Sequence, residues 1–391
     1  MSQSLRVGSS DPPAVLHVVG ARPNFMKAAP VIRALADLGV SQRLVHTGQH
    51  YDRELSSVFF EDLGLPQPDW NLQVGSGSQA RQTARIMVAL ERLLSTVRPR
   101  LVIVYGDVNS TLAAALVAAK LGIPLAHVEA GLRSFDDSMP EETNRRVTDL
   151  LSQILFVTAP EAIENLRQMG VPSSRIYFVG NPMIDSLLAA LVRCEPDRIC
   201  ASLQLQSPYV VVTLHRPGNV DDSRRVRRLT AMLTCLAKDA EVIFPVHPRG
   251  RRAFTRAGLR SHAGLRMIPP LGYLDFVALM RGATAVVTDS GGIQEETTVL
   301  GIPCLTLRPN TERPITVTAG TNRLVEPEDA PSLVRQLLAS PPQGKPTAPP
   351  LWDGEAGPRI ARVVRAWLRW NNDDGVVKPH DAGLPPILGT S

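Results

Sequence analysis

Three acidic residues, Asp107, Glu129 and Glu141, have the type and spacing needed for proton chemistry on a bound substrate. Asp107 follows the apolar run LVIVY, Glu129 ends a second apolar run, LAHVE, and Arg133 and Glu141 come next. Ligands bind beyond the carboxyl ends of the strands in open parallel sheets. We therefore expect the three carboxylates to converge there, with cations nearby, at a site of acid–base chemistry.

A segment in the second half, Thr288 to Gly292, has the pattern of a phosphate-binding turn. It connects an apolar run to an expected helix, and the N–H groups at a helix start favour anions. Gly291 and Gly292 let phosphate oxygens approach these groups, and Ser290 adds a hydroxyl donor. A nucleophilic serine would need glycine at position 288, which is threonine, so phosphate binding is the favoured interpretation.

Five further residues of the second half are candidates for contact with a nucleotide. Glu296 could accept hydrogen bonds from both hydroxyls of a ribose, or it could be an exposed helix carboxylate. Leu271 and Phe276 could sandwich a base, or they could form the hydrophobic staple of a helix start. His215 and His247 each end an apolar run, where a functional role competes with capping of the loop.

The first apolar run, residues 14–19, leads into the turn Gly20-Ala21-Arg22 and a helix that we expect to end near Leu38. A strand followed by a glycine turn and a helix start places backbone N–H groups around an anion. Arg22 and Lys27 would add positive charge. The alternative is an ordinary strand–helix turn with basic residues on its surface, and the position of Arg22 within the turn favours the anion site.

Two other patterns do not carry a function. Gly75 to Ala80 matches a GxGxxA dinucleotide fingerprint, but it does not follow a buried strand, so we expect only a helix start there. His127 and Glu129, with Cys304, resemble part of the zinc deaminase pattern. That pattern requires a second cysteine at position 307, which is leucine, so we expect no metal site.

Composition excludes several classes of protein. A net charge of +5 with only 5% aromatic residues argues against nucleic-acid binding, although arginines cluster at 224–228 and 249–252. The four cysteines form no CxxC pair, so we expect neither a zinc ribbon nor a disulfide scaffold. No apolar run approaches the ~18 residues of a membrane span, and we see no signal peptide. We therefore expect a cytoplasmic protein that does not act at a membrane.

Strand and helix patterns alternate in both halves of the chain, which predicts an α/β protein with two parallel-sheet domains facing one cleft. The first domain is expected over residues 1–185, with the carboxylates, and the second over 186–353, with the phosphate-binding turn. Residues 194–208 have the composition of a polar connector. Residues 354–391 are expected to form a helix that returns to the first domain and a loose tail.

Eleven motifs, in unbroken order from about residue 14 to about residue 370, closely resemble the non-hydrolysing UDP-N-acetylglucosamine 2-epimerase family. They are GARPNFMKAAP, HTGQHYD, YGDVNSTL, HVEAGLRS, MPEETNRR, VGNPMID, TLHRPGNV, FPVHPR, LGYLDF, TDSGGIQEE and NTERPIT. The resemblance implies two Rossmann-like domains in a glycosyltransferase-B-like arrangement. It also implies interconversion of UDP-N-acetylglucosamine and UDP-N-acetylmannosamine without NAD or a catalytic metal, by a homodimer that serves polysaccharide biosynthesis.

The resemblance also assigns roles to residues that match the family motifs. Catalytic positions are Asp107, Glu129, Glu141 and His215. Positions that bind the nucleotide and its phosphates are Arg22, Lys27, Ser290, Gly291, Gly292, Glu296 and Arg313, with Leu271 and Phe276 in the uracil pocket. We add Arg133 and His247 as substrate-binding candidates. The sequence departs from the family at Pro217-Gly218-Asn219, and its loop at residues 74–78 lacks a basic residue, which bears on activation by substrate.

The proton on C2 of the sugar is poorly acidic, because no carbonyl is adjacent to it. Loss of UDP first, or at the same time, makes its removal feasible and gives a 2-acetamidoglucal, to which UDP returns. The sequence leaves open which carboxylate is the base. Four alternatives also stay open: an epimerase of a modified UDP-2-acetamido sugar, a hydrolysing epimerase, a transferase of the same architecture, and an inactive nucleotide-sugar sensor.

Overall fold

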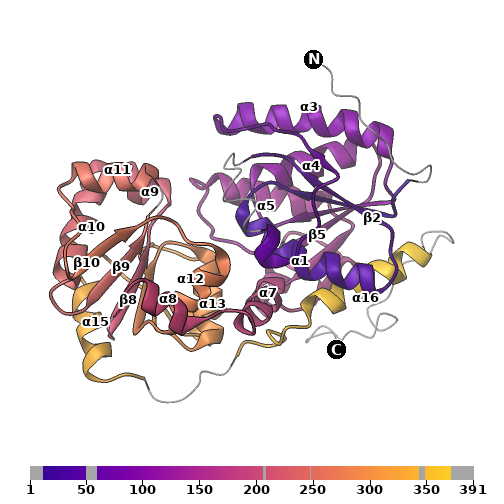
Figure 1. Ribbon diagram of the computed structural model, residues 1–391. Helices are drawn as coiled ribbons and strands as arrows, with labels where there is room; N and C mark the ends of the chain where they lie inside the picture. Colours follow the sequence, from indigo (N-terminus) through magenta and orange to yellow (C-terminus); the bar gives the residue numbers. More distant parts are fainter. Residues whose placement is uncertain (1–11, 50–59, 206–207, 247, 343–347, 371–391) are drawn as a thin grey trace. The chain divides into compact units, whose positions relative to one another are not determined.

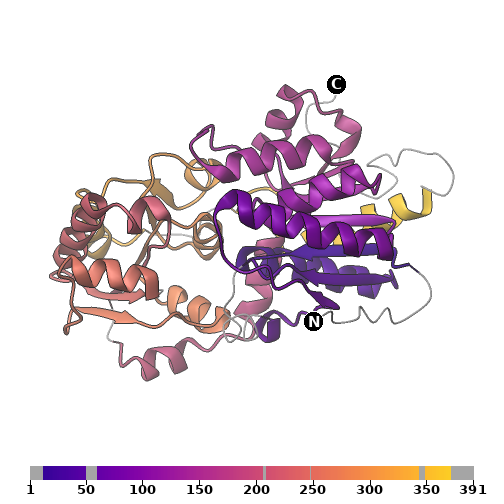
Figure 2. The ribbon, with the colours of Figure 1, turned by 90° about the horizontal axis from the view of Figure 1, so that it is seen from above.

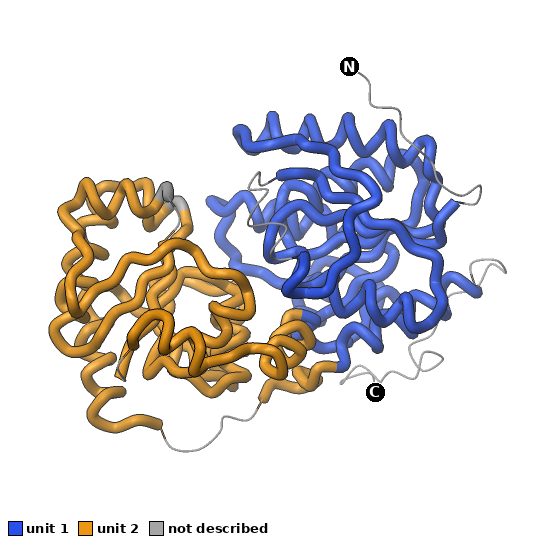
Figure 3. Tube along the Cα trace, in the orientation of Figure 1, with its two compact units in different colours: residues 1–182, 355–391 blue, residues 183–354 orange. Residues whose placement is uncertain are grey.

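The computed structural model describes residues 12–49, 60–205, 208–246, 248–342 and 348–370 of the chain. The chain divides into two compact units (Figure 3). Unit 1 comprises residues 1–182 and 355–391, and unit 2 comprises residues 183–354. Each unit is built on its own parallel sheet, as the alternating pattern predicts.

Unit 1 holds a seven-stranded sheet in the order β3-β2-β1-β4-β5-β6-β7, and every pair of neighbouring strands is parallel. The central strands are buried along their whole length, as parallel strands covered on both faces must be. The strands are β1 (Val15–Val19), β2 (Gln42–His46), β3 (Trp70–Asn71), β4 (Leu101–Tyr105), β5 (Leu125–Ala130), β6 (Ile154–Val157) and β7 (Ile176–Phe178).

Helices cover both faces of this sheet. Figures 1 and 2 show α3 and α4 on one face and α1 with α16 on the other. Helix α16, which ends the described chain, packs closely on α1. The closeness is shown at Gly357, where a Cβ would lie 2.7 Å from the carbonyl oxygen of Pro30. The helices of unit 1 are α1 (Arg22–Asp37), α3 (Gln79–Val97), α4 (Asn109–Lys120), α5 (Pro140–Leu151), α6 (Pro160–Gln168), the 3-10 helix η1 (Ser173–Arg175) and α16 (Ala356–Trp370).

Unit 2 holds a six-stranded sheet in the order β10-β9-β8-β11-β12-β13, again with parallel neighbours. The strands are β8 (Tyr209–Thr213), β9 (Glu241–Pro245), β10 (Leu265–Ile268), β11 (Ala285–Thr288), β12 (Cys304–Thr306) and β13 (Asn322–Leu324). The helices are α7 (Pro182–Leu191), α8 (Pro196–Ser202), α9 (Pro217–Val220), α10 (Ser223–Leu236), α11 (Pro248–Arg256), α12 (Tyr273–Arg281), α13 (Gly291–Leu300), α14 (Ile315–Thr318) and α15 (Ala330–Ala339).

One sequence-based expectation for this unit is wrong. Residues 194–208 were expected to form a polar connector, yet Pro196–Ser202 is the helix α8. Its only buried residue is Ile199, so the segment carries almost no apolar periodicity from which a helix could be predicted. The side chain of Arg198 forms ion pairs with Glu195 and, on α12, with Asp275.

The strand order of each sheet reverses direction at one point. In unit 1 the reversal lies between β1 and β4, and in unit 2 it lies between β8 and β11. Ligands of open parallel sheets bind outside the carboxyl ends of the strands at such a point. The turn of Asp107 follows β4, and the segments at His215 and Ser290 follow β8 and β11, so these predicted residues lie at a reversal.

Among the described residues, no helix has both the length and the apolar character required to cross a membrane.

Candidate active site

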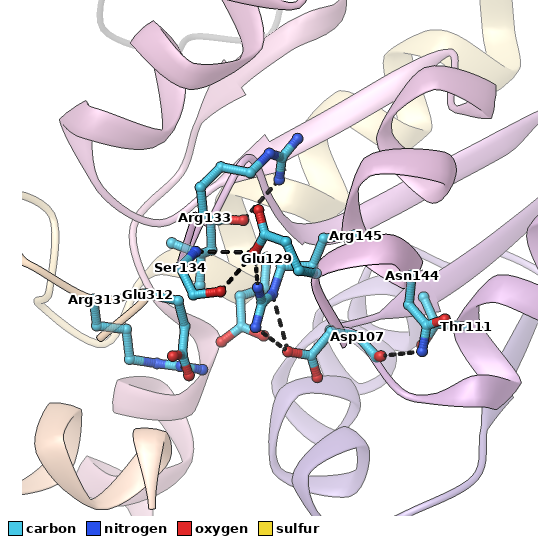
Figure 4. Close-up of polar contacts among 12 residues, drawn as sticks. Asp107, Thr111, Glu129, Arg133, Ser134, Asn144, Arg145, Glu312 and Arg313 are labelled. Carbon is cyan, nitrogen blue, oxygen red and sulfur yellow. Dashed lines mark hydrogen bonds and ion pairs between the residues drawn. The ribbon is translucent and has the colours of Figure 1, made fainter. Parts of the chain in front are cut away.

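Asp107 lies in the turn between β4 and α4, and its carboxylate pairs with an arginine on α5 (Figure 4). Arg145 donates from Nε to Oδ2 of Asp107 at 3.1 Å, and its Nη2 lies 3.0 Å from the same oxygen. The Asp107 side chain keeps 24% of its exposure, whereas Arg145 is almost completely buried. The turn therefore presents a carboxylate that is paired with arginine and partly accessible. Sequence analysis missed Arg145, whose only signal is its place in the NRR segment one helical turn after Glu141.

Glu129 lies near the end of β5 in a buried ion pair with Lys27 of α1. Its backbone has φ = 73°, in the left-handed region that a side chain such as glutamate rarely adopts. The pairing of β5 with β6 shifts register between Val128 and Ala130, so Glu129 occupies a bulge. Bulges and strained backbone at a strand end redirect side chains and cluster at functional sites.

Gly106 directly precedes Asp107 and lies against the Lys27–Glu129 ion pair. It has φ = 62°, and a Cβ there would lie 2.8 Å from Nζ of Lys27 and 3.1 Å from Oε2 of Glu129. Gly122, with φ = 65°, has nothing within 4 Å of such a Cβ. The turn before Asp107 can therefore approach the buried ion pair only because residue 106 has no side chain.

We expect Gly106→Ala to lower kcat by about 100-fold, because the added methyl group displaces the pair at Glu129 and shifts the turn that carries Asp107. Gly122→Ala is the matched control, since it imposes the same left-handed strain, about 1–2 kcal/mol, without the contacts. Both variants are compared in turnover and thermal unfolding. Equal effects of the two substitutions on kcat would show that only backbone strain matters at position 106.

The two adjacent glutamates at the start of α5 have different environments. Glu142 is buried, accepts hydrogen bonds from the backbone and hydroxyl of Ser134 at 2.9 Å each, and pairs with Arg145 and Arg146. Glu141 is half-buried, and no described residue bonds to its carboxylate. Glu142 therefore holds the preceding loop in place, and Glu141 is the one with a carboxylate available to a substrate.

Arg133, predicted to bind substrate, lies in a buried ion pair instead. Its Nη2 donates to Oδ2 of Asp149 at 2.6 Å, and Oδ1 of Asp149 lies 2.7 Å from Nδ1 of His127. Burial alone would raise the pKa of Asp149, but the hydrogen bonds and charges of His127 and Arg133 together lower it. Since its guanidinium is committed to Asp149, we do not include Arg133 in the binding site proposed below.

The turn after β1 does not form the expected backbone anion site. The N–H groups of Gly20 and Ala21 both donate to the side-chain oxygen of Asn24, at 3.0 and 3.1 Å. This expectation is corrected because an internal amide occupies the place of the anion. Arg22 is the half-buried first residue of α1, and Lys27 lies one turn further along, on Glu129.

In unit 2, His215 is oriented by a buried carboxylate. Nδ1 of His215 lies 3.0 Å from Oδ1 of Asp289, while 58% of the histidine side chain stays exposed. The backbone N–H groups of His215 and Arg216 and the side chain of Asn219 also donate to Asp289. Burial would raise the pKa of Asp289, but these groups, His215 first among them, lower it to about 2. Asp289 is thus a positioning residue that sequence analysis passed over.

The start of α13 combines glycines with a cation, as the phosphate-binding interpretation requires. Ser290 is the N-cap, and the helix begins Gly291-Gly292. A Cβ on Gly291 would lie 2.4 Å from Nη1 of Arg313, so the guanidinium lies directly against this helix terminus. The N–H groups of the first turn have no partner within the helix. The positive end of the helix dipole and the arginine charge therefore act at one place.

Buried acids hold Arg313 there. Its Nε lies 2.9 Å from Oε1 of Glu295, and its Nη1 pairs with Glu312. Burial would raise the pKa of Glu312, but the charges of Arg313, Arg308 and Arg216 hold it well below its usual range. The two carboxylates therefore hold the side chain of Arg313 in one orientation. Sequence analysis could not predict these two ion pairs.

Glu296 is buried, with 2% of its surface exposed, and accepts a hydrogen bond of 2.9 Å from the hydroxyl of Tyr273. Burial is the main cause that raises the pKa of Glu296 from 4.5 to about 7, and the charge of Glu295 adds to it. An exposed helix carboxylate is therefore excluded. A buried carboxylate with one oxygen engaged can use its remaining lone pairs for neighbouring hydroxyl donors.

We expect Glu296→Gln to stabilise the protein above pH 7 by up to about 3 kcal/mol, while weakening its affinity for UDP. Glu296 binds its proton more tightly in the folded than in the unfolded state. Its contribution to the free energy of unfolding is therefore fully present below pH 4.5 and is lost as the pH rises through about 7. Glutamine never bears this charge. Urea unfolding at pH 5 and pH 8 measures the difference, with exposed Glu91→Gln as control. If the gain in stability of Glu296→Gln did not grow with pH, the raised pKa of Glu296 would be contradicted.

The remaining predicted residues are Leu271, Phe276 and His247. Leu271 and Phe276 are half-buried and occupy the positions before and within the first turn of α12 that form a hydrophobic staple. Both the staple and contact with a base are compatible with this placement. His247 falls outside the described part of the chain. Within that part, no group of three histidine, cysteine or acidic residues could hold a metal ion.

Comparisons with known proteins place this geometry in a family. A family model described as UDP-N-acetylglucosamine 2-epimerase matches residues 33–365. The UDP-N-acetylglucosamine 2-epimerase of Methanocaldococcus jannaschii is 38% identical over 357 residues, covering 89% of this chain and 97% of that protein. The UDP-2,3-diacetamido-2,3-dideoxy-D-glucuronate 2-epimerase of Pseudomonas aeruginosa is 42% identical over 315 residues. The match covers 80% of this chain and 88% of that protein.

A solved structure agrees with this result. The crystal structure of the Methanocaldococcus jannaschii UDP-GlcNAc 2-epimerase in complex with UDP-GlcNAc and UDP matches with a TM-score of 0.84 at 37% identity, covering 90% of this chain and 99% of that one. The predicted fold, two parallel-sheet α/β domains of the glycosyltransferase-B-like class, is confirmed. The chain belongs to the UDP-N-acetylglucosamine 2-epimerase family.

Proposed function

We propose that this protein interconverts UDP-N-acetylglucosamine and UDP-N-acetylmannosamine without net hydrolysis. The observation that carries the proposal is Glu129, which bears a strained backbone and a buried lysine partner beside the turn of Asp107. Strained backbone of this kind clusters at active sites, which favours a catalytic role for Glu129 over nucleotide binding alone. Membership of the family makes the chain an epimerase, which is an isomerase.

The proposed first step is departure of UDP from C1 of the sugar. The N-terminus of α13, with Ser290, Gly291 and Gly292, and the guanidinium of Arg313 stabilise the diphosphate as its charge develops. Glu296 holds the ribose, and Leu271 with Phe276 contacts the uracil. Removing one donor of this kind typically lowers a rate by about 10²–10³-fold. His215, turned outward by Asp289, is available to donate a proton or hydrogen bond to the leaving group.

The proposed second step is removal of the C2 proton, which gives a 2-acetamidoglucal. Asp107, Glu129 and Glu141 are the groups that we assign to this proton transfer and to stabilisation of positive charge on the sugar ring. Arg145 forms an ion pair with Asp107, Lys27 forms one with Glu129, and Glu141 has no described partner. UDP then returns to C1 as a proton is delivered to the opposite face of C2.

A modified UDP-2-acetamido sugar is a second candidate substrate. Its support is the Pseudomonas aeruginosa relative named for a diacetamido uronate, whose identity of 42% exceeds the 38% of the Methanocaldococcus jannaschii epimerase. Both reactions invert the same stereocentre next to the same leaving group. They differ only in groups at C3 and C6, so the proposed roles of the acids and of α13 are unchanged.

Product analysis separates these possibilities. The purified chain is incubated separately with UDP-N-acetylglucosamine and with UDP-2,3-diacetamido-2,3-dideoxyglucuronate, and products are followed by proton NMR. We expect the manno epimer of the first compound with UDP still attached. Free UDP with free sugar would indicate a hydrolysing epimerase, and conversion of the uronate alone would assign the second substrate. No change in either compound would indicate a transferase or a sensor.

The homodimer implied by the resemblance stays a prediction, and so does the cytoplasmic location expected from the absence of a membrane span or signal peptide in the sequence. Light scattering of the purified chain and cell fractionation test them.

A further inference from the structure

A buried histidine of β5 connects the turn of Asp107 to helix α5. His127 has no exposed surface; its Nε2 lies 2.8 Å from the carbonyl oxygen of Gly106, and its Nδ1 lies 2.7 Å from Oδ1 of Asp149. A carbonyl oxygen can only accept a hydrogen bond, so Nε2 carries a proton and donates it. The ring therefore holds the residue immediately before Asp107.

Asp149 extends this connection to the chain after Glu129. Its Oδ2 accepts from the backbone N–H of Gly131 at 3.2 Å and from Nη2 of Arg133 at 2.6 Å. The buried carboxylate of Asp149 is thus hydrogen-bonded directly to the chain that follows Glu129. Through His127 it is also linked to Gly106, the residue before Asp107. Neither His127 nor Asp149 has a role in the reaction proposed above.

The Gly106 turn needs such a support. Glycine at φ = 62° has more accessible backbone conformations than any other residue, and the Cα of Gly106 lies against the Lys27–Glu129 pair. A hydrogen bond to its carbonyl selects one orientation of the peptide that leads into Asp107. A displacement of about 1 Å at a reacting group can lower a rate about 100-fold.

We propose that His127, oriented by Asp149, is a positioning residue that fixes Asp107 relative to Glu129. The inference rests on the proposed function for its kinetic consequences, but its structural content is independent of the substrate. His127 touches no reacting atom in this account. Its contribution is made through the peptide of Gly106.

Two substitutions separate the two hydrogen bonds of the ring. The amide of Gln in His127→Gln reaches the place of Nε2 and can still donate to Gly106, whereas the amide of Asn in His127→Asn reaches only the place of Nδ1. We expect His127→Asn to lower kcat about 100-fold with KM within about threefold of wild type, and His127→Gln to retain most of the activity. Asp149→Asn can still hold Nε2–H toward Gly106, so its loss should be smaller than that of His127→Asn.

His17 supplies the matched control. It is a buried histidine of β1 in the same sheet, with Nδ1 2.7 Å from the hydroxyl of Tyr105 and Nε2 2.9 Å from Oε1 of Gln42. It contacts side chains of the core and not the turn. We expect His17→Asn to lower the melting temperature as much as His127→Asn does, while kcat stays within about threefold of wild type.

Hydrogen–deuterium exchange of a peptide covering residues 101–112 tests the inference without activity. We expect faster exchange at this peptide in His127→Asn than in His127→Gln or His17→Asn. Equal kcat in the Asn and Gln variants, or equal exchange in all three, overturns the proposal even if a variant is destabilised. An inactive wild-type protein would overturn the proposed function, and the exchange comparison would still decide the role of His127.

Discussion

Asp107→Asn is expected to lower kcat by about 10²–10⁴-fold and to leave the affinity for UDP within about threefold of wild type, because it removes a proton-transferring group but no proposed nucleotide contact. Asparagine preserves the shape of the residue, and its oxygen can still accept from Nε and Nη2 of Arg145. It cannot take up or release a proton at the pH of the assay. Turnover by NMR and UDP binding by calorimetry measure the two effects separately.

The matched control for this prediction is Asp137→Asn. Asp137 lies in the loop between β5 and α5, is 83% exposed and pairs with Arg146 at 3.1 Å on the surface. Surface pairs of this kind contribute about 0–1 kcal/mol, so kcat should stay within about twofold of wild type. Near-normal turnover of Asp107→Asn would remove Asp107 from the mechanism.

Lys27→Met is expected to destabilise the protein by about 3–5 kcal/mol, since it leaves the carboxylate of Glu129 buried without this cation. The lysine and glutamate side chains are 3% and 2% exposed, so water cannot replace the lost partner. Methionine has a similar length and no charge. Urea unfolding followed by circular dichroism measures the loss, and the exposed Lys120→Met at the end of α4 is the control.

A double variant shows whether the charge is responsible. Lys27→Met combined with Glu129→Gln contains neither charge, so we expect it to recover at least half of the stability lost in Lys27→Met, although it is inactive. If the two substitutions were simply additive in the free energy of unfolding, the pair would not act as a unit, and the cause of the loss would be packing.

The strands and most helices of both units follow from the sequence because each strand is a short apolar run followed by glycine or a polar turn. The same regularity places Asp107 and Glu129 at the ends of neighbouring strands. The pattern is local, and a parallel sheet brings together the carboxyl ends of its strands. The prediction of where the site lies therefore needs only the alternation of strand and helix.

The partners of these acids could not be predicted in the same way. Arg145 and Asp149 are polar residues of an amphipathic helix, and nothing local distinguishes them from solvent-exposed ones. Glu141 and Glu142 are adjacent, so the helix turns them in different directions, and only tertiary packing shows that Glu142 is the buried one. Asn24 likewise accepts hydrogen bonds from the N–H groups of the glycine turn, which the sequence pattern assigned to an anion.

The central claim is that this protein removes and returns the proton on C2 of a UDP-linked 2-acetamido sugar. Incubation with UDP-N-acetylglucosamine in deuterated water tests it most directly. We predict that deuterium replaces hydrogen at C2 in both epimers while UDP stays attached, and that Asp107→Asn abolishes the exchange. Epimerisation with the original hydrogen retained at C2, or no exchange in the active protein, would contradict this account.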